Sequence, residues 1–301
     1  MQIMTSQWAH LSVQSTLYYN LAQSAQKKVG EIEKNYKINL DLNLGDSIAE
    51  NLLRFVSKLF YKDGSWDPLY APTYLREQGI NKVPIMNYSG NSFNTIVHNA
   101  AGTFYIAKHL INYLTNSKST LNYTQNFILT ALKNDYVISI CRALGIISKT
   151  VTEPYWRCAG DSNRNALNMR SIYEQLIDLF TNGSNSPNLL ITNRLQLVIG
   201  PQLEPDKVSQ SLFEKSSLDD MTQSVLQQLC TVIKDKSKQL FKDFLENGNL
   251  FNPSETLTNK SESCPQNNIS VERVCGELDT KIKQAPNCNI SNIEAYLNVQ
   301  K

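Results

Sequence analysis

The sequence has few of the residues that interrupt regular structure. Only 12 of its 301 residues are glycine and only 10 are proline. This scarcity disfavours a turn-rich all-β fold and is typical of proteins built from long helices. Charged residues are also few, at 19%, whereas hydrophobic residues make up 41% of the chain. That hydrophobic fraction is sufficient for a sizeable core.

Other absences exclude classes of protein. No run of 18 apolar residues occurs, so we expect no membrane partner and no membrane-spanning helix. The first residues lack a basic stretch followed by an apolar one, so we expect a nuclear or cytoplasmic protein that is not secreted. The net charge of +2 excludes a basic footprint for nucleic acid over the whole chain. Contact with DNA would need a local patch, such as Lys234, Lys236, Lys238 and Lys242, but these lysines are better interpreted as the solvated face of a helix.

Familiar catalytic motifs are missing as well. Neither a glycine-rich phosphate loop nor a Gly-x-Ser-x-Gly elbow occurs in the sequence. The six cysteines are irregularly spaced, which gives no support for a zinc site and is typical of reduced, buried thiols. His98 and His109 would share one helix face, but at 1.5 Å per residue they would lie roughly 16 Å apart, too far for one metal ion. We therefore expect this chain to bind no cofactor.

The dominant pattern is one of apolar residues three or four positions apart, which is the spacing of amphipathic helices. Ser47 and Glu50 form a capping-box pattern at the start of one such helix. The last long helix is expected to begin with Ser217 as its cap, to hold Asp219 and Asp220 in its first turn, and to end at Asn247-Gly248. The preceding helices are expected at about 18–36, 47–60, 92–114, 124–132, 135–148 and 165–180.

Two further segments are expected between these helices. Lys82–Ile85 is predicted to be extended, because the residue before Pro84 avoids the α region. Residues 188–199 fit either a helix or an extended run. Together these patterns predict a mainly α fold without a sheet of four or more strands. The expected organisation is a helical domain over 1–248, a polar linker over 249–268 and a C-terminal helical tail over 269–301.

The tail carries apolar side chains at helical spacing. Several such residues left in water would be an association hazard, so we expect them to bind apolar surface. They would either fold back on the long helices or dock on a second copy, and we expect self-association or binding of a protein partner. The residues of this expected interaction surface are Val271, Val274, Leu278, Ile282, Ile293, Tyr296 and Leu297.

The same tail contains a recognisable order of motifs. It reads Asn268-Ile-Ser-Val-Glu-Arg-Val-Cys-Gly and continues to Asn289-Ile-Ser-Asn-Ile-Glu-Ala-Tyr-Leu-Asn. This resembles the end of hAT-superfamily DNA transposases, in which a Ser-x-x-x-Glu-Arg-x-Phe-Ser-like stretch precedes a basic helix and an Asn-x-Glu-Ala-Leu-like helix. The chain departs from that pattern at Cys275, where the family has an aromatic residue, and at Gly276, where it has a small hydroxyl residue.

The resemblance implies specific expectations. Such transposases have an RNase H-like sheet interrupted by a helical insertion, with two Asp residues before the insertion and one Glu after it. These acids hold divalent metals that activate water and the 3′-hydroxyl. Glu272 corresponds to that Glu, residues 1–250 would correspond to the insertion region, and the two Asp residues would precede residue 1. Magnesium would then bind only if the missing acids were supplied. Without the resemblance, Glu272 is interpreted as a first-turn acid that stabilises a helix N-terminus.

The sequence therefore supports one leading interpretation and two alternatives. The leading interpretation is a transposase-derived, domesticated and non-catalytic helical protein that acts by dimerisation or by binding a partner. The first alternative is a metal-dependent DNA transposase or nuclease fragment that uses Glu272. The second alternative is an unrelated helical scaffold.

Overall fold

The computed structural model describes residues 14–36, 47–61, 71–88, 93–117, 120–159, 166–199 and 204–261. The chain divides into two compact units. The larger unit comprises Tyr19–Cys158 and Arg170–Asn252, and the smaller comprises Met1–Tyr18, Ala159–Met169 and Pro253–Lys301. No residue within the described ranges lies in a β-strand, so the prediction of a mainly α fold is confirmed.

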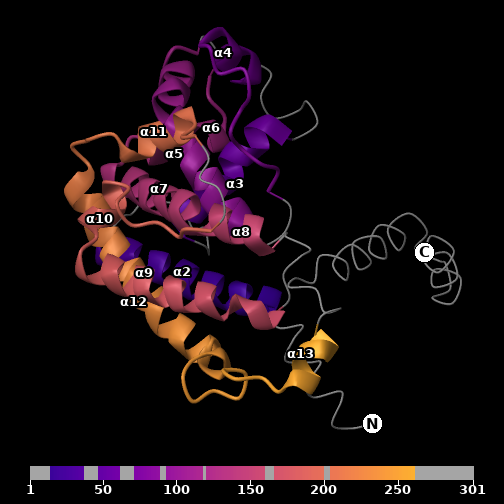
Figure 1. Ribbon diagram of the computed structural model, residues 1–301. Helices are drawn as coiled ribbons and strands as arrows, with labels where there is room; N and C mark the ends of the chain where they lie inside the picture. Colours follow the sequence, from indigo (N-terminus) through magenta and orange to yellow (C-terminus); the bar gives the residue numbers. More distant parts are fainter. Residues whose placement is uncertain are drawn as a thin grey trace, which may run out of the picture. The chain divides into compact units, whose positions relative to one another are not determined.

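The helices vary from single turns to more than five turns (Figure 1). None of the helices that the structure describes contains a stretch both long and apolar enough to cross a membrane. In chain order they are α2 (Gln14–Asn35), α3 (Ile48–Tyr61), α4 (Ala71–Glu77), α5 (Phe93–Thr115), α6 (Tyr123–Leu132), α7 (Asp135–Ile147), the π-helix η1 (Ser148–Thr152), α8 (Glu153–Ala159), the 3-10 helix η2 (Ala166–Met169), α9 (Arg170–Asn185), α10 (Asn188–Ile191), α11 (Lys207–Phe213), α12 (Asp219–Leu240), the 3-10 helix η3 (Lys242–Phe244) and α13 (Glu255–Ser261).

Helix α7 lies at the centre of the larger unit. Its residues from Val137 to Ile147 are all buried, because nearly every position is apolar rather than one stripe. Helix α5 packs along α7, α12 contacts α7 from another side, and α9 packs against α12 (Figure 1). Helices α3, α6 and α11 pack against α5. The long helices therefore form successive layers around α7, with α5 and α11 close to its C-terminal end.

A buried arginine joins α7 to the start of α12. The Arg142 side chain is fully buried, and its guanidinium donates to the carbonyl oxygens of Leu212 at 2.9 Å and Glu214 at 2.7 Å. Its third partner is the Asp219 carboxylate, 2.6 Å away. A buried charge is tolerated only when it is paired and hydrogen-bonded, which is the situation here. The sequence suggested only that Asp219 interacts favourably with the helix dipole. In the structure Asp219 also pairs with the buried Arg142 guanidinium.

The ends of α12 differ from the prediction. The helix starts at Asp219 without a side-chain cap, so the predicted capping role of Ser217 is wrong. It ends at Leu240 rather than at Asn247-Gly248. At its C-terminal end the buried Phe241 ring stacks on Tyr173 with 4.1 Å between ring centroids. Burial of these two rings directs the chain towards the core before it reaches Gly248.

Helix α9, in contrast, ends later than predicted. It continues through Asn182-Gly183 to Asn185. A Cβ at position 183 would lie 2.9 Å from the Cys230 sulfur on α12. Glycine at this position permits the close approach of two helices, and it does not end one.

Helix α3 has two N-terminal caps. The Ser47 hydroxyl accepts a hydrogen bond from the Glu50 amide at 3.0 Å, as the sequence predicted. A tertiary cap comes from α2, where the Glu33 carboxylate accepts from the amides of Ile48 and Ala49, each at 2.8 Å. Desolvation by burial raises the pKa of Glu33, even though these backbone hydrogen bonds act in the opposite direction.

The smaller unit is described only in part. Within the stretch expected to be a polar linker, 249–268, the structure has helix α13. The Ser254 hydroxyl accepts a hydrogen bond from the Leu257 amide at 3.3 Å at its start. Ser254 is therefore an N-cap residue, which the polar composition of this stretch did not reveal.

Candidate functional site

Two hollows meet on the larger unit at Asp206. The Lys149 hollow has a volume of about 290 Å³, and the His98 hollow has a volume of about 630 Å³. Asp206 lines both hollows. The remaining walls of the Lys149 hollow include Lys149, Glu153, Arg157, Gln196 and Val198. Those of the His98 hollow include Lys82, Met86, His98, Tyr105, Lys207 and Val208.

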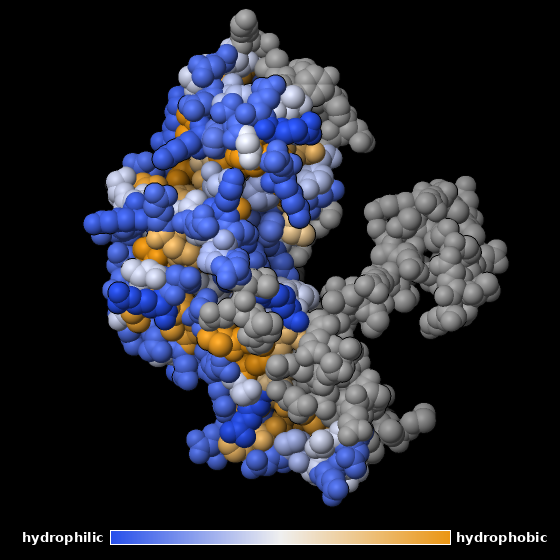
Figure 2. All heavy atoms as spheres, turned by 45° about the horizontal axis from the view of Figure 1, so that its top comes forward, coloured by the Kyte–Doolittle hydropathy of each residue, from blue (hydrophilic) through white to orange (hydrophobic). Residues whose placement is uncertain are grey.

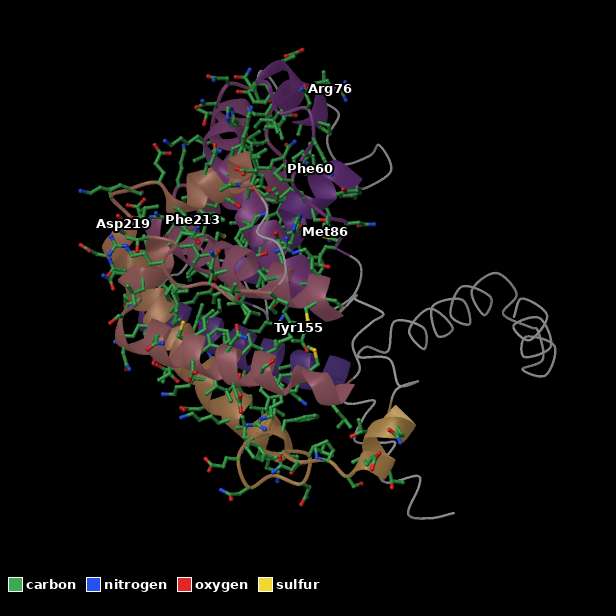
Figure 3. The ribbon with its side chains drawn as sticks, in the orientation of Figure 1. Phe60, Arg76, Met86, Tyr155, Phe213 and Asp219 are labelled. Carbon is green, nitrogen blue, oxygen red and sulfur yellow. The ribbon has the colours of Figure 1, made fainter. Side chains whose placement is uncertain are left out.

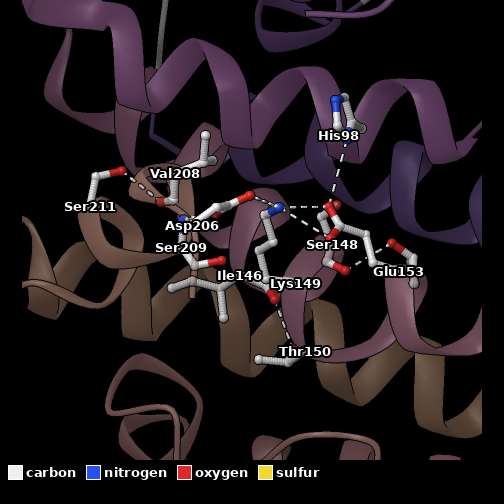
Figure 4. Close-up of polar contacts among 11 residues, drawn as sticks. His98, Ile146, Ser148, Lys149, Thr150, Glu153, Asp206, Val208, Ser209 and Ser211 are labelled. Carbon is white, nitrogen blue, oxygen red and sulfur yellow. Dashed lines mark hydrogen bonds and ion pairs between the residues drawn. The ribbon is translucent and has the colours of Figure 1, made fainter. Parts of the chain in front are cut away.

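A chain of four polar side chains crosses from one hollow to the other (Figure 4). His98 Nδ1 on α5 lies 3.6 Å from Glu153 Oε1 on α8. Lys149 Nζ, on the π-helix, lies 3.0 Å from Glu153 Oε1 and 3.0 Å from Asp206 Oδ2. Asp206 in turn caps α11 by accepting from the Ser209 amide at 2.7 Å. Glu153 and Lys149 thereby connect His98 on α5 with Asp206 at the start of α11.

The electrostatics of this chain favour ionised acids. Burial alone would raise the pKa of Glu153, but its contact with His98 and the charge of Lys149 outweigh burial and lower that pKa. The pKa of Asp206 is lowered in the same way, since the Ser209 amide and Lys149 outweigh its desolvation. Both carboxylates are therefore charged at neutral pH and committed to Lys149. Neither is held as a neutral acid or as a free base.

Pro154 explains why the π-helix occurs at this point. In a continuous α-helix the Thr150 carbonyl would accept from residue 154, but proline has no N–H and its ring crowds that carbonyl. The backbone instead widens to a π-turn over Ser148–Thr152, in which the Glu153 amide donates to Ser148. The Thr150 carbonyl accepts from the Leu197 amide at 2.8 Å. This bond holds Leu197 in place. Leu197 belongs to a non-helical run that also includes Gln196 and Val198 and forms one wall of the Lys149 hollow.

A second non-helical run, residues 83–88, contains no turn or bend, whereas Lys82, the first residue of the stretch expected to be extended, lies in a bend. Helix side chains hold it in place. The Asn99 amide accepts from Met86 N at 2.7 Å and donates to Met86 O at 3.0 Å. The Ser57 hydroxyl donates to Met86 O at 2.9 Å and accepts from Tyr88 N at 2.9 Å. Asn99 and Ser57 are both buried, so their side chains have little freedom to move away from the run.

The same run is fixed by a close backbone contact. A Cβ at position 102 would overlap the carbonyl oxygen of Pro84, so Gly102 allows α5 to lie directly against the run. The Tyr61 hydroxyl, at the end of α3, donates to the Ile85 carbonyl at 2.7 Å. Together with Asn99 these contacts leave the run little freedom, and it forms a rigid wall of the His98 hollow.

Exposed hydrophobic side chains gather around the two hollows. Four large hydrophobic residues stand exposed among the described residues: Tyr61 at 49%, Met86 at 46%, Tyr123 at 58% and Val198 at 59%. All except Tyr123 line one of the two hollows. Figure 2 shows hydrophobic patches between hydrophilic side chains on one face, and Figure 3 labels Met86 at its place on the ribbon. The polar chain is thus bordered by apolar side chains that project into solvent.

The histidines and the described cysteines have separate surroundings. His98 contacts Glu153, and His109 lies eleven residues further along the same helix. Cys141, Cys158 and Cys230 are buried. Burial raises the pKa of Cys141 and of Cys230 to about 12 in each case, so these thiols stay protonated. The interpretation of buried, unreactive thiols holds for these two residues.

The lysines considered for DNA contact lie on and just after α12. Lys234 is 3.4 Å from Asp235, and the Lys236 ammonium donates to Gln239 at 3.2 Å. Lys238 and Lys242 are exposed. The acid between the lysines reduces the local positive charge of this helix face.

The site residues expected from the sequence all lie outside the described ranges. This applies to Glu272 and to the apolar tail residues from Val271 to Leu297. Within the described part of the chain, no group of three or more His, Cys, Asp or Glu side chains is placed to hold a metal ion.

The chain of four polar side chains was not predicted, although the sequence contains two signals near it. Asp206 follows Pro205 and precedes a short amphipathic helix, a typical N-cap position. Pro154 lies inside what otherwise reads as one helix, which is a signal for a bulge. No local pattern links Lys149 to Asp206, because these residues are 57 positions apart.

Comparison with known proteins adds no relative. No protein-family model matches the chain, and neither curated proteins nor solved structures give a significant match.

Proposed function

We propose that this chain is a non-catalytic, helical interaction protein of transposase-like descent that works by binding another polypeptide chain. One observation carries the proposal. Three of the four exposed large hydrophobic residues in the described ranges border two adjoining hollows. Apolar side chains around a polar centre are typical of surfaces that bind proteins. The charge pairing at Lys149 leaves the nearby acids without the free proton or base that catalysis would need.

The proposal includes self-association as its simplest form. In that form, the apolar tail residues of one copy, from Val271 to Leu297, supply the second contact on a partner copy. By resemblance, Glu272 keeps the position of a transposase acid. Magnesium would bind there only if the two missing aspartates came from elsewhere.

A site-specific cross-linker tests the proposal. p-Benzoylphenylalanine replaces Met86 in one variant and Tyr123 in another, since both residues are exposed but only Met86 lines a hollow. We expect irradiation at tens of micromolar to yield a covalent dimer from the first variant and not from the second. If partner binding dominates instead, the Met86 position should cross-link a discrete partner from cell extract. Equal labelling from both positions, or labelling from neither, would refute the proposal.

Sedimentation equilibrium provides the second readout. We expect the full chain to associate in the micromolar range and the variant Met86→Lys to associate less. Tyr123→Lys adds the same charge at a similarly exposed hydrophobic residue away from the hollows and should leave association unchanged.

A further inference from the structure

We infer that the His98 hollow is a binding site for an aliphatic carboxylate, a small molecule with one anionic head and an apolar chain. This inference goes beyond the proposed function, because such a ligand requires no polypeptide partner. Small-molecule sites are concave, largely apolar hollows of about 300–1,000 Å³ with a few placed polar groups. The His98 hollow, at about 630 Å³, falls within this range.

Helix α5 contributes one side of this hollow. Residues 79–86 and 206–208 contribute the others. The first of these segments lies against α5 at Gly102, and the second leads into α11, which packs on α5. His98 and Tyr105 both line the hollow, and a separation of seven positions brings two helical side chains to the same face about 10 Å apart. The hollow therefore extends over two turns of α5, which gives it the length to hold a chain.

Apolar side chains supply most of the lining. The Met86 side chain projects into solvent, while the Met86 backbone is held by Asn99 and Ser57. An apolar chain that covers Met86 thus removes apolar surface from water without breaking these hydrogen bonds. Each methylene that becomes fully buried should tighten binding roughly fourfold. The other apolar residues of the lining are Ile80, Val83, Pro84, Ile85 and Val208.

The wall that carries Met86 is formed before any ligand arrives. The Pro84 carbonyl lies against Gly102 so closely that no side chain would fit between them. Buried Asn99 and Ser57 hold the following residues. A pre-organised wall loses little conformational entropy on binding, which favours a small ligand.

The unpaired charges of the hollow are positive, which indicates the head group of the ligand. Lys82 and Lys207 line the hollow from different segments, both are exposed, and neither makes an ion pair within the described part of the chain. Asp206, the one acid among the described lining residues, is already paired with Lys149 at 3.0 Å. The hollow therefore favours an anion over a cation.

A carboxylate suits these two lysines better than a phosphate does. An ammonium group acts as a point charge and holds a carboxylate without a fixed fork geometry. Phosphate recognition typically uses the bidentate fork of arginine, and no arginine is among the described residues that line this hollow. One carboxylate head on an apolar chain matches both the charge and the lining.

Methyl NMR tests the inference directly. The probe is decanoate, titrated below its micelle concentration against the full chain with ¹³C-labelled methionine methyl groups. We expect a saturable shift of the Met86 methyl signal with a Kd at or below about 1 mM. The signals of Met169, which is fully buried, and Met221, which lies on α12, should not change.

Two comparisons among ligands separate the chain from the head group. Hexanoate, octanoate and decanoate should bind in rising order, with roughly a tenfold gain for each added pair of methylenes. Decyltrimethylammonium has the same chain length as decanoate with the opposite charge, and it should bind at least tenfold more weakly.

Paired lysine variants test where the head group binds. Lys82→Gln with Lys207→Gln should weaken decanoate binding about three- to tenfold, and because both residues are exposed the fold should be retained. Lys236→Gln with Lys238→Gln removes the same charge from α12, where neither residue lines the hollow, and should leave binding unchanged.

Each outcome decides the inference. Absence of a saturable Met86 shift up to about 1 mM decanoate would overturn it, and so would equal affinity for decyltrimethylammonium. Equal weakening by the two lysine pairs would also overturn it, because that result indicates attraction by net charge alone. Cross-linking at Met86 is measured without decanoate, so the proposed function and this inference can fail separately.

Discussion

The Thr150 carbonyl accepts its hydrogen bond from the Leu197 amide, 2.8 Å away and 47 positions later in the chain. Pro154, which occupies the position of the usual α-helical donor, cannot make that bond. One imino acid thus creates the π-turn, frees a carbonyl and fixes a distant segment beside Lys149. The Lys149 hollow owes one of its walls to this arrangement.

Replacing that proline tests the relationship. In Pro154→Ala, residue 154 regains an N–H that competes for the Thr150 carbonyl, so the Leu197 amide should lose its partner. We expect that amide to exchange with solvent roughly tenfold faster, in line with the 0.5–1.5 kcal/mol typical of one hydrogen bond. Hydrogen exchange followed by NMR measures this. Pro205→Ala, in the same hollow, is the control, and an unchanged Leu197 rate in both variants would contradict the assignment.

The buried Arg142 makes a different prediction. Arg142→Ala should destabilise the protein by about 3–5 kcal/mol, because it removes a paired buried cation and leaves the carbonyls of Leu212 and Glu214 without a donor. Asp219→Ala should also destabilise it, because the guanidinium loses its only carboxylate partner within the described ranges. Asp220→Ala, one position further on and exposed, should change stability by less than about 0.5 kcal/mol.

Denaturant unfolding at neutral pH compares the three variants. Equal effects of Asp219→Ala and Asp220→Ala would mean that both acids act only through the helix dipole, as the sequence alone suggests.

Two glycines in helices should respond in opposite directions. Gly102→Ala places a methyl group onto the Pro84 carbonyl and should cost about 1–3 kcal/mol. Gly30→Ala on α2 meets nothing within 4 Å and should stabilise the protein by about 0.5–1 kcal/mol. Thermal unfolding of both variants beside the parent chain measures this. A neutral Gly102→Ala would show that the run at 83–88 does not lie against α5.

Glu33 predicts a pH dependence with a definite sign. Its pKa is raised above the ordinary value of 4.5 in the folded protein, so the unfolded chain releases the proton first as pH rises. The contribution of Glu33 to stability therefore falls between pH 4.5 and its folded pKa. Glu33→Gln cannot titrate, and it should gain stability relative to the parent chain as pH rises through that window.

Unfolding free energies measured from about pH 4 to pH 7 provide this comparison. Glu31→Gln, on the exposed face of the same helix, is the matched control. A parent chain that gains stability over Glu33→Gln with rising pH would show that the hydrogen bonds from Ile48 and Ala49 dominate over burial.

Much of the local structure was predictable from the sequence, because its causes are local. The three-four spacing of apolar residues placed α3, α5, α6 and α7 close to their observed positions. The Ser47 cap followed from the same kind of short-range rule. The wrong predictions were of helix ends, at Ser217, Gly183 and Asn247-Gly248. At Gly183 and after Leu240, tertiary packing overrides the local signal.

The candidate site was decided by tertiary structure alone. Lys149 and Asp206 are 57 positions apart, and Asn99 and Met86 lie on different segments. Periodicity identifies which face of a helix is buried, but not which distant segment covers it. The amino-acid sequence determined a mainly α chain with a proline inside one helix. The packing of α5 and α11 against α7 and the π-helix that follows it determined which charges meet.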